Sequence, residues 1–259
     1  MTFLRKTGEK NTEEQLTEKA PHFHTKLSHK FLIKADALRV NNMFKESIKH
    51  YLSALMLERE NVDIYIGLAQ SYMFLKEFDK AVEVLEKAEK TEPENARLPF
   101  ELGCCFMQMG LPCVAAVKFK EAIVLDKDNL DAQLQLGIAH EIMDEPEMAL
   151  KVYQCIIEKH PSYFKAYQHK ASLLVELSQY KEASQIFAEL IKINPQYYKA
   201  ILGIGLCFDK LGRTDGAVRY YKKFLRLKPD SKNAPDVVNR LEKIKKEKLF
   251  ENKNFLRLA

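Results

Sequence analysis

The chain of 259 residues contains no tryptophan, and it has only nine glycines and nine prolines. So few turn-forming residues argue against a loop-rich or all-β protein. No apolar run reaches the roughly 18 residues that a membrane-spanning helix needs, so we expect no membrane span. The first residues are polar throughout and lack the apolar core of a signal peptide, which predicts a cytoplasmic protein.

The cysteines do not predict a disulfide framework or a metal site. They number five, an odd count, and none forms a CxxC pair; they are Cys104, Cys105, Cys113, Cys155 and Cys207. We therefore expect reduced thiols that mostly fill the core, which fits a reducing compartment.

The sequence also lacks the motifs of catalysis and cofactor binding. The glycines within residues 203–205 have neither a third glycine nor a preceding strand, so they form no phosphate loop. His22, His24 and His29 have no other ligand types nearby, and we interpret them as part of a solvated tail. His140 occupies a core position of its helix and is expected to be a buried, hydrogen-bonded histidine. We therefore predict no catalytic residue, no cofactor and no metal, and a protein that is not an enzyme.

Charge is unevenly distributed along the chain, which carries a formal net charge of +5. Residues 1–30 carry about +2, residues 31–216 about −5 and residues 217–259 about +8. A nucleic-acid-binding domain would show a basic face throughout the fold. The pattern therefore predicts no nucleic-acid partner, and we also expect no membrane partner.

What the sequence does contain is a period of 34 residues. Pro161, Pro195 and Pro229 are separated by this interval. Six consecutive windows follow from Ser28, with the boundaries 28–61, 62–95, 96–129, 130–163, 164–197 and 198–231. Position 8 of each window is small, namely Ala35, Ala69, Gly103, Gly137, Ala171 and Gly205. Position 20 is also small, namely Ser47, Ala81, Ala115, Ala149, Ala183 and Ala217, whereas position 24 is always large.

Each window divides into two helical patterns. In the second window, Tyr65, Leu68 and Tyr72 have the 3–4 spacing of one apolar helix face, and Phe78 and Leu85 belong to another. Small residues at positions 8 and 20 allow two antiparallel helices to approach closely. Because one such pair cannot bury its own apolar face, the period predicts stacked pairs that share a core.

This pattern of small, large and proline positions resembles the tetratricopeptide repeat, and the resemblance covers residues 28–231. It implies an all-α, right-handed superhelical solenoid of antiparallel helix pairs. The family's tryptophan at position 4 is absent, and the first window has Ser47 and Arg59 where alanine and proline are usual. Residues 1–27 are expected to be flexible or weakly helical, and residues 232–259 to form a C-terminal capping helix and tail.

The resemblance also implies that positions 2, 5, 9, 12 and 13 of each first helix line a concave groove. These positions give a mainly apolar set with flanking charges. The candidate groove residues are Leu32, Asp63, Ile66, Met73, Phe74, Arg97, Phe100, Met107, Asp131, Leu134, Ile138, Lys165, Leu202 and Leu206. An alternative interpretation is that the apolar residues at position 5 pack adjacent repeats against each other.

We therefore expect a non-enzymatic adaptor that binds an apolar or amphipathic segment of another protein in this groove. Three alternatives stay open from the sequence. One is self-association through the groove, an end face or the apolar C-terminal tail, which would give a homo-oligomer. Another is a regulatory subunit of a larger enzyme or secretion complex. The third is nucleic-acid binding through the C-terminal lysines, which would weaken steeply with salt.

Overall fold

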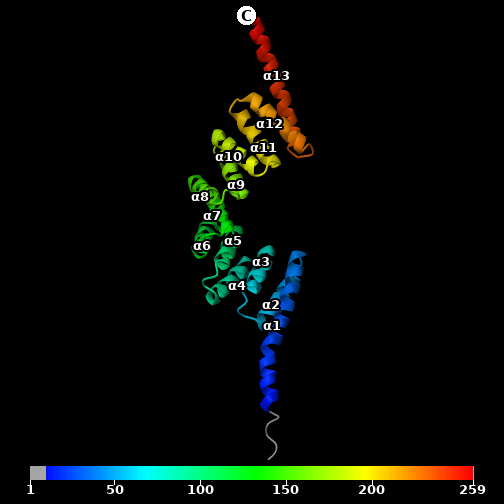
Figure 1. Cartoon of the computed structure of the whole chain (residues 1–259), viewed down its shortest axis with the longest axis vertical. Coiled ribbons are helices and arrows are strands. Elements are labelled where there is room, and N and C mark those ends of the chain that lie inside the picture. The colour runs from blue at the N-terminus through cyan, green and yellow to red at the C-terminus, as the bar shows by residue number, and fades with distance from the viewer. Residues whose placement is uncertain (1–9, 259) are drawn as a thin grey trace, which may run out of the picture. The chain divides into compact units, whose positions relative to one another are not determined.

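A computed structural model of the protein describes residues 10–258, with side chains described from His24 to Phe250. Within that range the chain forms thirteen α-helices and no β-strand (Figure 1). The helices are α1 (Lys10–Val40), α2 (Phe44–Leu57), α3 (Val62–Phe74), α4 (Phe78–Thr91), α5 (Arg97–Gln108), α6 (Pro112–Leu125), α7 (Leu130–Ile142), α8 (Pro146–Lys159), α9 (Phe164–Glu176), α10 (Tyr180–Ile193), α11 (Tyr198–Lys210), α12 (Thr214–Leu227) and α13 (Ala234–Leu258). The predicted all-α class is confirmed. None of the described helices is both long and apolar enough to cross a lipid bilayer.

The chain divides into two compact units, residues 1–139 and residues 140–259, with the boundary inside α7. In the first unit each helix from α1 to α6 packs on the next, and in the second unit the same holds from α8 to α13. Neighbours in the sequence are therefore neighbours in space, which is the arrangement expected for stacked helix pairs.

The first helix begins earlier than the first window. Residues 10–27, which we expected to be flexible or weakly helical, are the N-terminal part of α1. Ser28 is fully buried, and its hydroxyl donates a hydrogen bond to the carbonyl oxygen of Ala54 at 3.3 Å. Residues 1–9 lie outside the described part of the chain.

Each of the six turns between paired helices contains a residue in the left-handed region, always at position 15 of its window. These residues are Asn42, Lys76, Gly110, Asp144, Ser178 and Gly212, with φ between 58° and 75°. In the α3–α4 turn, the amide of Glu77 donates to the carbonyl of Tyr72 and the amide of Lys76 donates to that of Met73, both at 2.9 Å. This is the Schellman motif, which satisfies the last carbonyls of a helix and reverses the chain.

The small and large positions of the period fit together as expected. The residues at position 20 are all fully buried, including Ser47, whose hydroxyl lies 2.9 Å from that of Ser71. A Cβ atom added to Gly103 would lie 2.5 Å from Cε1 of Phe119, the residue at position 24 of the same window. One added to Gly67 would lie 2.4 Å from the Tyr51 ring, which belongs to the preceding window. The large residue therefore fills the space between its own pair and the next one.

The C-terminal helix α13 covers the last pair of the second unit. Ala234, Val237 and Ile244 are buried in one core cluster with residues of α11 and α12. Arg240 holds Asp209 of α11 with two hydrogen bonds, of 2.7 Å from Nε and 2.6 Å from Nη2. These contacts shield apolar surface that a further repeat would otherwise cover.

Candidate functional site

The apolar groove candidates of the first unit mostly pack between helices. Ile66, Met73 and Leu134 are only 5–6% exposed. The side chains of Leu32, Phe100, Met107 and Ile138 are half-buried. Phe74 is 63% exposed, and its ring stacks on that of Phe44 with the centroids 4.6 Å apart. On this face, burial against neighbouring repeats uses much of the apolar surface that the sequence suggested would be open.

The polar candidates of the first unit are partly engaged with one another. Arg97 and Asp63, both exposed, form an ion pair of 2.6 Å between α5 and α3. Further along the same two helices, Gln70 donates a hydrogen bond of 2.8 Å to Glu101. Burial raises the pKa of the Glu101 carboxyl, which the hydrogen bond from Gln70 partly opposes. Asp131, the last charged candidate of this unit, is exposed.

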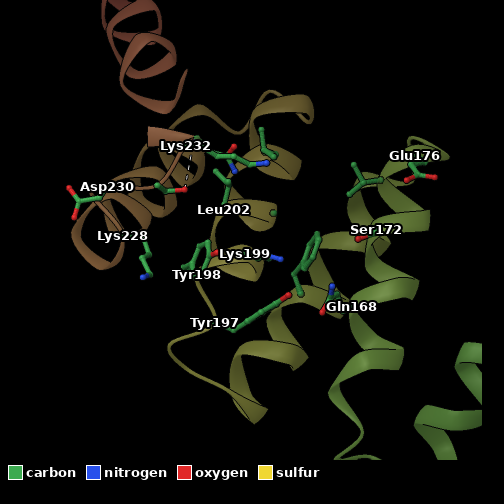
Figure 2. A pocket seen from close by; sticks show the side chains of 16 residues that line it. Gln168, Ser172, Glu176, Tyr197, Tyr198, Lys199, Leu202, Lys228, Asp230 and Lys232 are labelled. Carbon is green, nitrogen blue, oxygen red and sulfur yellow. Dashed lines mark hydrogen bonds between the residues drawn. The ribbon is translucent and has the colours of Figure 1, made fainter. Parts of the chain in front are cut away.

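The second unit has a cavity of about 620 Å³ on the corresponding face (Figure 2). Four parts of the chain form its walls, namely α9, Phe187 of α10, α11 as far as Leu206 with the tyrosine before it, and the loop from α12 to α13. Gln168 and Ser172 of α9 occupy positions 5 and 9 of their window, and Leu202 and Leu206 of α11 occupy the same positions of the next. The volume lies within the roughly 300–1,000 Å³ typical of ligand-binding sites.

The interior of this cavity is mainly apolar and aromatic. Phe187 and Leu202 are 7% and 8% exposed and form its deeper wall, whereas Leu206 is 44% exposed. Tyr197 and Tyr198 stand at one side, with their ring centroids 6.5 Å apart. Burial raises the pKa of the Tyr197 phenol, so this group stays protonated and can donate a hydrogen bond at neutral pH. Large side chains of a ligand could be buried here without leaving polar groups unpaired.

Charged side chains surround the opening. Lys199, Lys228 and Lys232 are exposed, and none forms an ion pair with another residue of the described chain. The ammonium of Lys228 lies 5.8 Å from the centroid of the Tyr198 ring, within the range of a cation–π contact. Figure 2 shows Lys199 and Tyr197 extending from the α11 side toward α9. Glu176 and Asp230 add two negative charges to the lining.

Sequence reasoning found part of this site. Leu202 and Leu206 were candidate groove residues and line the cavity, whereas Lys165, the other candidate of this unit, is exposed at the start of α9 and is not among the lining residues. Tyr197 and Lys228 were missed, because they belong to the connections between repeats and reach the cavity only through the path of the chain. The adjacent pair Tyr197 and Tyr198 at a helix start was the available signal in the sequence.

The other polar groups do not suggest catalysis. All five cysteines are free, two of them buried, one half-buried and two exposed. Burial raises the pKa of Cys104 to about 12 and those of Cys105 and Cys207 to about 11, so these thiols remain protonated at neutral pH. Among the described residues, no group of three His, Cys, Asp or Glu side chains could hold a metal ion. His140 is 5% exposed, and its Nδ1 lies 2.6 Å from Oε2 of Glu145. It is the buried, hydrogen-bonded histidine that its position predicted, while His22 lies outside the described side chains.

Two models of one protein family match the chain. Both are described as tetratricopeptide repeat, and they cover residues 41–99 and residues 170–232. The first region lies within the first unit, and the second includes most of the lining of the cavity.

Relatives among known proteins are distant. The human protein DnaJ homolog subfamily C member 7 is 24% identical over 224 residues, which is 82% of this chain and 45% of that protein. The chain thus spans less than half the length of this curated relative. The crystal structure of MamA is similar with a TM-score of 0.57 and 29% identity, over 66% of this chain and 93% of that one. PilF of Pseudomonas aeruginosa shares the fold with a TM-score of 0.65 and 17% identity, over 84% and 99% of the two chains.

Proposed function

Because the chain is a tetratricopeptide repeat protein, a class whose members serve as protein-interaction scaffolds, we propose that it is a non-enzymatic adaptor for a segment of another protein. The bound segment inserts an apolar or aromatic side chain into the cavity of the second unit. The observation that carries this proposal is the cavity itself, because an open, apolar and aromatic hollow is costly to leave exposed in a folded domain.

The cavity favours a particular kind of peptide. Phe187, Leu202 and Leu206 offer apolar surface, so a Phe, Tyr, Leu or Met side chain would gain about 1.5–3 kcal/mol on full burial. The three lysines at the opening outnumber the two carboxylates, so an acidic residue beside the anchor is favoured over a basic one. The protonated hydroxyl of Tyr197 can donate to a peptide carbonyl.

The first unit is considered by itself. Phe74 is exposed, and Phe100 and Met107 are partly exposed on its candidate groove face. A segment bound to this unit would also meet the ion pair of Asp63 and Arg97, and a charged peptide side chain can replace either partner.

A selection of random peptides on the full chain tests this proposal. Recovered peptides should share an apolar anchor next to an acidic residue. Leu206→Glu places a charge in the cavity at a residue that is already 44% exposed, so folding should persist. We expect it to weaken binding by about 10- to 100-fold, as the loss of one buried anchor contact implies.

Phe74→Glu is the matched control, because it adds the same charge to an exposed apolar side chain of the first unit. It should leave the affinity of the cavity for the peptide nearly unchanged. Equal affinity of the wild type and Leu206→Glu, with unchanged circular dichroism, would reject the cavity as the binding site.

A further inference from the structure

A strip of four cations lies on the outward side of α12. Arg219, Lys222, Lys223 and Arg226 are spaced i, i+3, i+4 and i+7, so they share one face of the helix. All four are exposed, and none forms an ion pair with another residue of the described chain. Four unpaired like charges on one helix face repel one another, and folding gains nothing from this arrangement.

The repeat allows the strip to be compared with equivalent positions elsewhere in the chain. These four residues occupy positions 22, 25, 26 and 29 of the last window. The same positions on α4 are Glu83, Glu86, Lys87 and Lys90, with no net charge. On α6, α8 and α10 the four positions also sum to zero, and on α2 they carry a single positive charge. The second helix of a repeat therefore does not require cations at these four positions. Packing of the repeat does not explain why α12 has a cation at each of them.

The second observation comes from α13. Lys248 of α13 is ion-paired with Asp215 of α12, one turn before Arg219, so α13 lies beside this strip at Lys248. Next to Lys248 in the sequence, Leu249 and Phe250 are 53% and 67% exposed. Lysines 243, 245 and 246 of the same helix are exposed as well. Exposed aromatic and aliphatic side chains among lysines are typical of helices that lie on a lipid surface.

We propose that the basic strip of α12, together with residues 243–250 of α13, binds the surface of an anionic phospholipid membrane. The cations contact lipid headgroups, and Leu249 and Phe250 enter the boundary between headgroups and acyl chains. Long Lys and Arg side chains on an outward helix face suit a charged plane, which needs no matching groove. Although the sequence suggested no membrane partner, the comparison between repeats and the exposed Leu249 and Phe250 favour a lipid surface over a nucleic acid.

The test is co-sedimentation of the full chain with vesicles of phosphatidylcholine alone or of phosphatidylcholine mixed with phosphatidylserine. We expect binding only to the anionic vesicles, and weaker binding as salt is raised. Replacing the four cations of the strip with glutamine should reduce the partition coefficient by on the order of 100-fold or more. The charge-matched control replaces Lys45, Lys49, Lys87 and Lys90, which are exposed in the first unit, and should reduce it less than about tenfold.

A double substitution, Leu249→Ser with Phe250→Ser, separates a lipid surface from any other polyanion. It should weaken vesicle binding at least several-fold and leave retention on a heparin column unchanged. The proposal is overturned if wild type fails to bind the anionic vesicles, if the control weakens binding as much as the strip variant, or if the double substitution has no effect. Binding of single-stranded RNA more tightly than anionic vesicles would also overturn it.

Discussion

The same face of the repeat is built differently in the two units. In the first unit, Asp63 pairs with Arg97 and Gln70 with Glu101, while Ile66 is buried against neighbouring helices. In the second unit, Gln168 and Ser172 stand opposite α11 across a cavity of about 620 Å³. The same repeat pattern therefore supports two kinds of face. One is partly closed by contacts between its own side chains, and the other is open. The difference lies in side chains at positions 2, 5, 6 and 9, and in the α12–α13 loop that lines the cavity of the second unit.

The largest expected effect compares the residue at position 24 in the two units. Phe119→Ala removes a fully buried ring from the first unit, and Phe187→Ala removes one that also lines the cavity. Each should lower the free energy of unfolding by about 3–5 kcal/mol, measured by urea denaturation. Only Phe187→Ala should also change peptide affinity. Loss of peptide binding by a folded Phe119→Ala variant would show that the two faces are not distinct.

A smaller effect concerns the attachment of α13 to the second unit. The hydrogen bonds from Arg240 lower the pKa of Asp209, so this carboxylate stabilises the fold above its unfolded pKa and loses that contribution as the pH falls through its folded pKa. Asp209→Asn should cost about 1–2 kcal/mol at pH 7, allowing for the partial exposure of Arg240.

Urea denaturation measures the free energy of unfolding of wild type and of Asp209→Asn. The difference between these two free energies should shrink when the pH is lowered below the unfolded pKa of the carboxyl. Asp128→Asn, at an exposed residue in the first unit, is the control and should be nearly neutral. A difference of constant size at acidic and neutral pH would contradict an ionic origin.

Substitution of the turn glycines should lower stability by the same amount in both units. Gly110 and Gly212 have φ of 75° and 69°, and no atom lies within 4 Å of a Cβ added at either position. Gly110→Ala and Gly212→Ala should therefore each cost about 1 kcal/mol through backbone strain alone. Lys76→Gly, at φ of 61°, should be neutral or stabilising. Thermal unfolding curves of the three variants measure this, and strong destabilisation by Lys76→Gly would contradict the assigned turn geometry.

The smallest expected effect is a change in stability at Glu101, on the partly closed face of the first unit. Burial raises the pKa of Glu101 above its unfolded value, so wild-type stability falls as the pH rises through this range. Glu101→Gln keeps an acceptor for Gln70 and removes the buried charge, so it should stabilise the first unit slightly at pH 7. The gain should disappear below the unfolded pKa, where the wild-type carboxyl is also protonated. A loss of stability at pH 7 would mean that the ionised carboxylate is required.

Most of the fold could be predicted from the sequence, because the residues that recur every 34 positions are those that pack the helices together. Small residues such as Ala81 and large ones such as Phe119 recur every 34 residues, and each repeat must satisfy the same close approach. The candidate site was harder to predict. Position 5 is buried at Ile66 and lines a cavity at Gln168, because exposure there depends on side chains of the next repeat. Lys228 lines the cavity because of the path that the α12–α13 loop takes. The 34-residue period does not predict that path.

The most direct test of the proposed adaptor role is methyl NMR of the full chain with a selected peptide. Binding in the cavity should shift the methyl signals of Val175, Leu202 and Leu206, and should leave those of Ile66 and Leu134 in the first unit nearly unchanged. Shifts confined to the first unit, or spread over both units without a maximum at Leu206, would contradict the assignment of the site to the open face of the second unit.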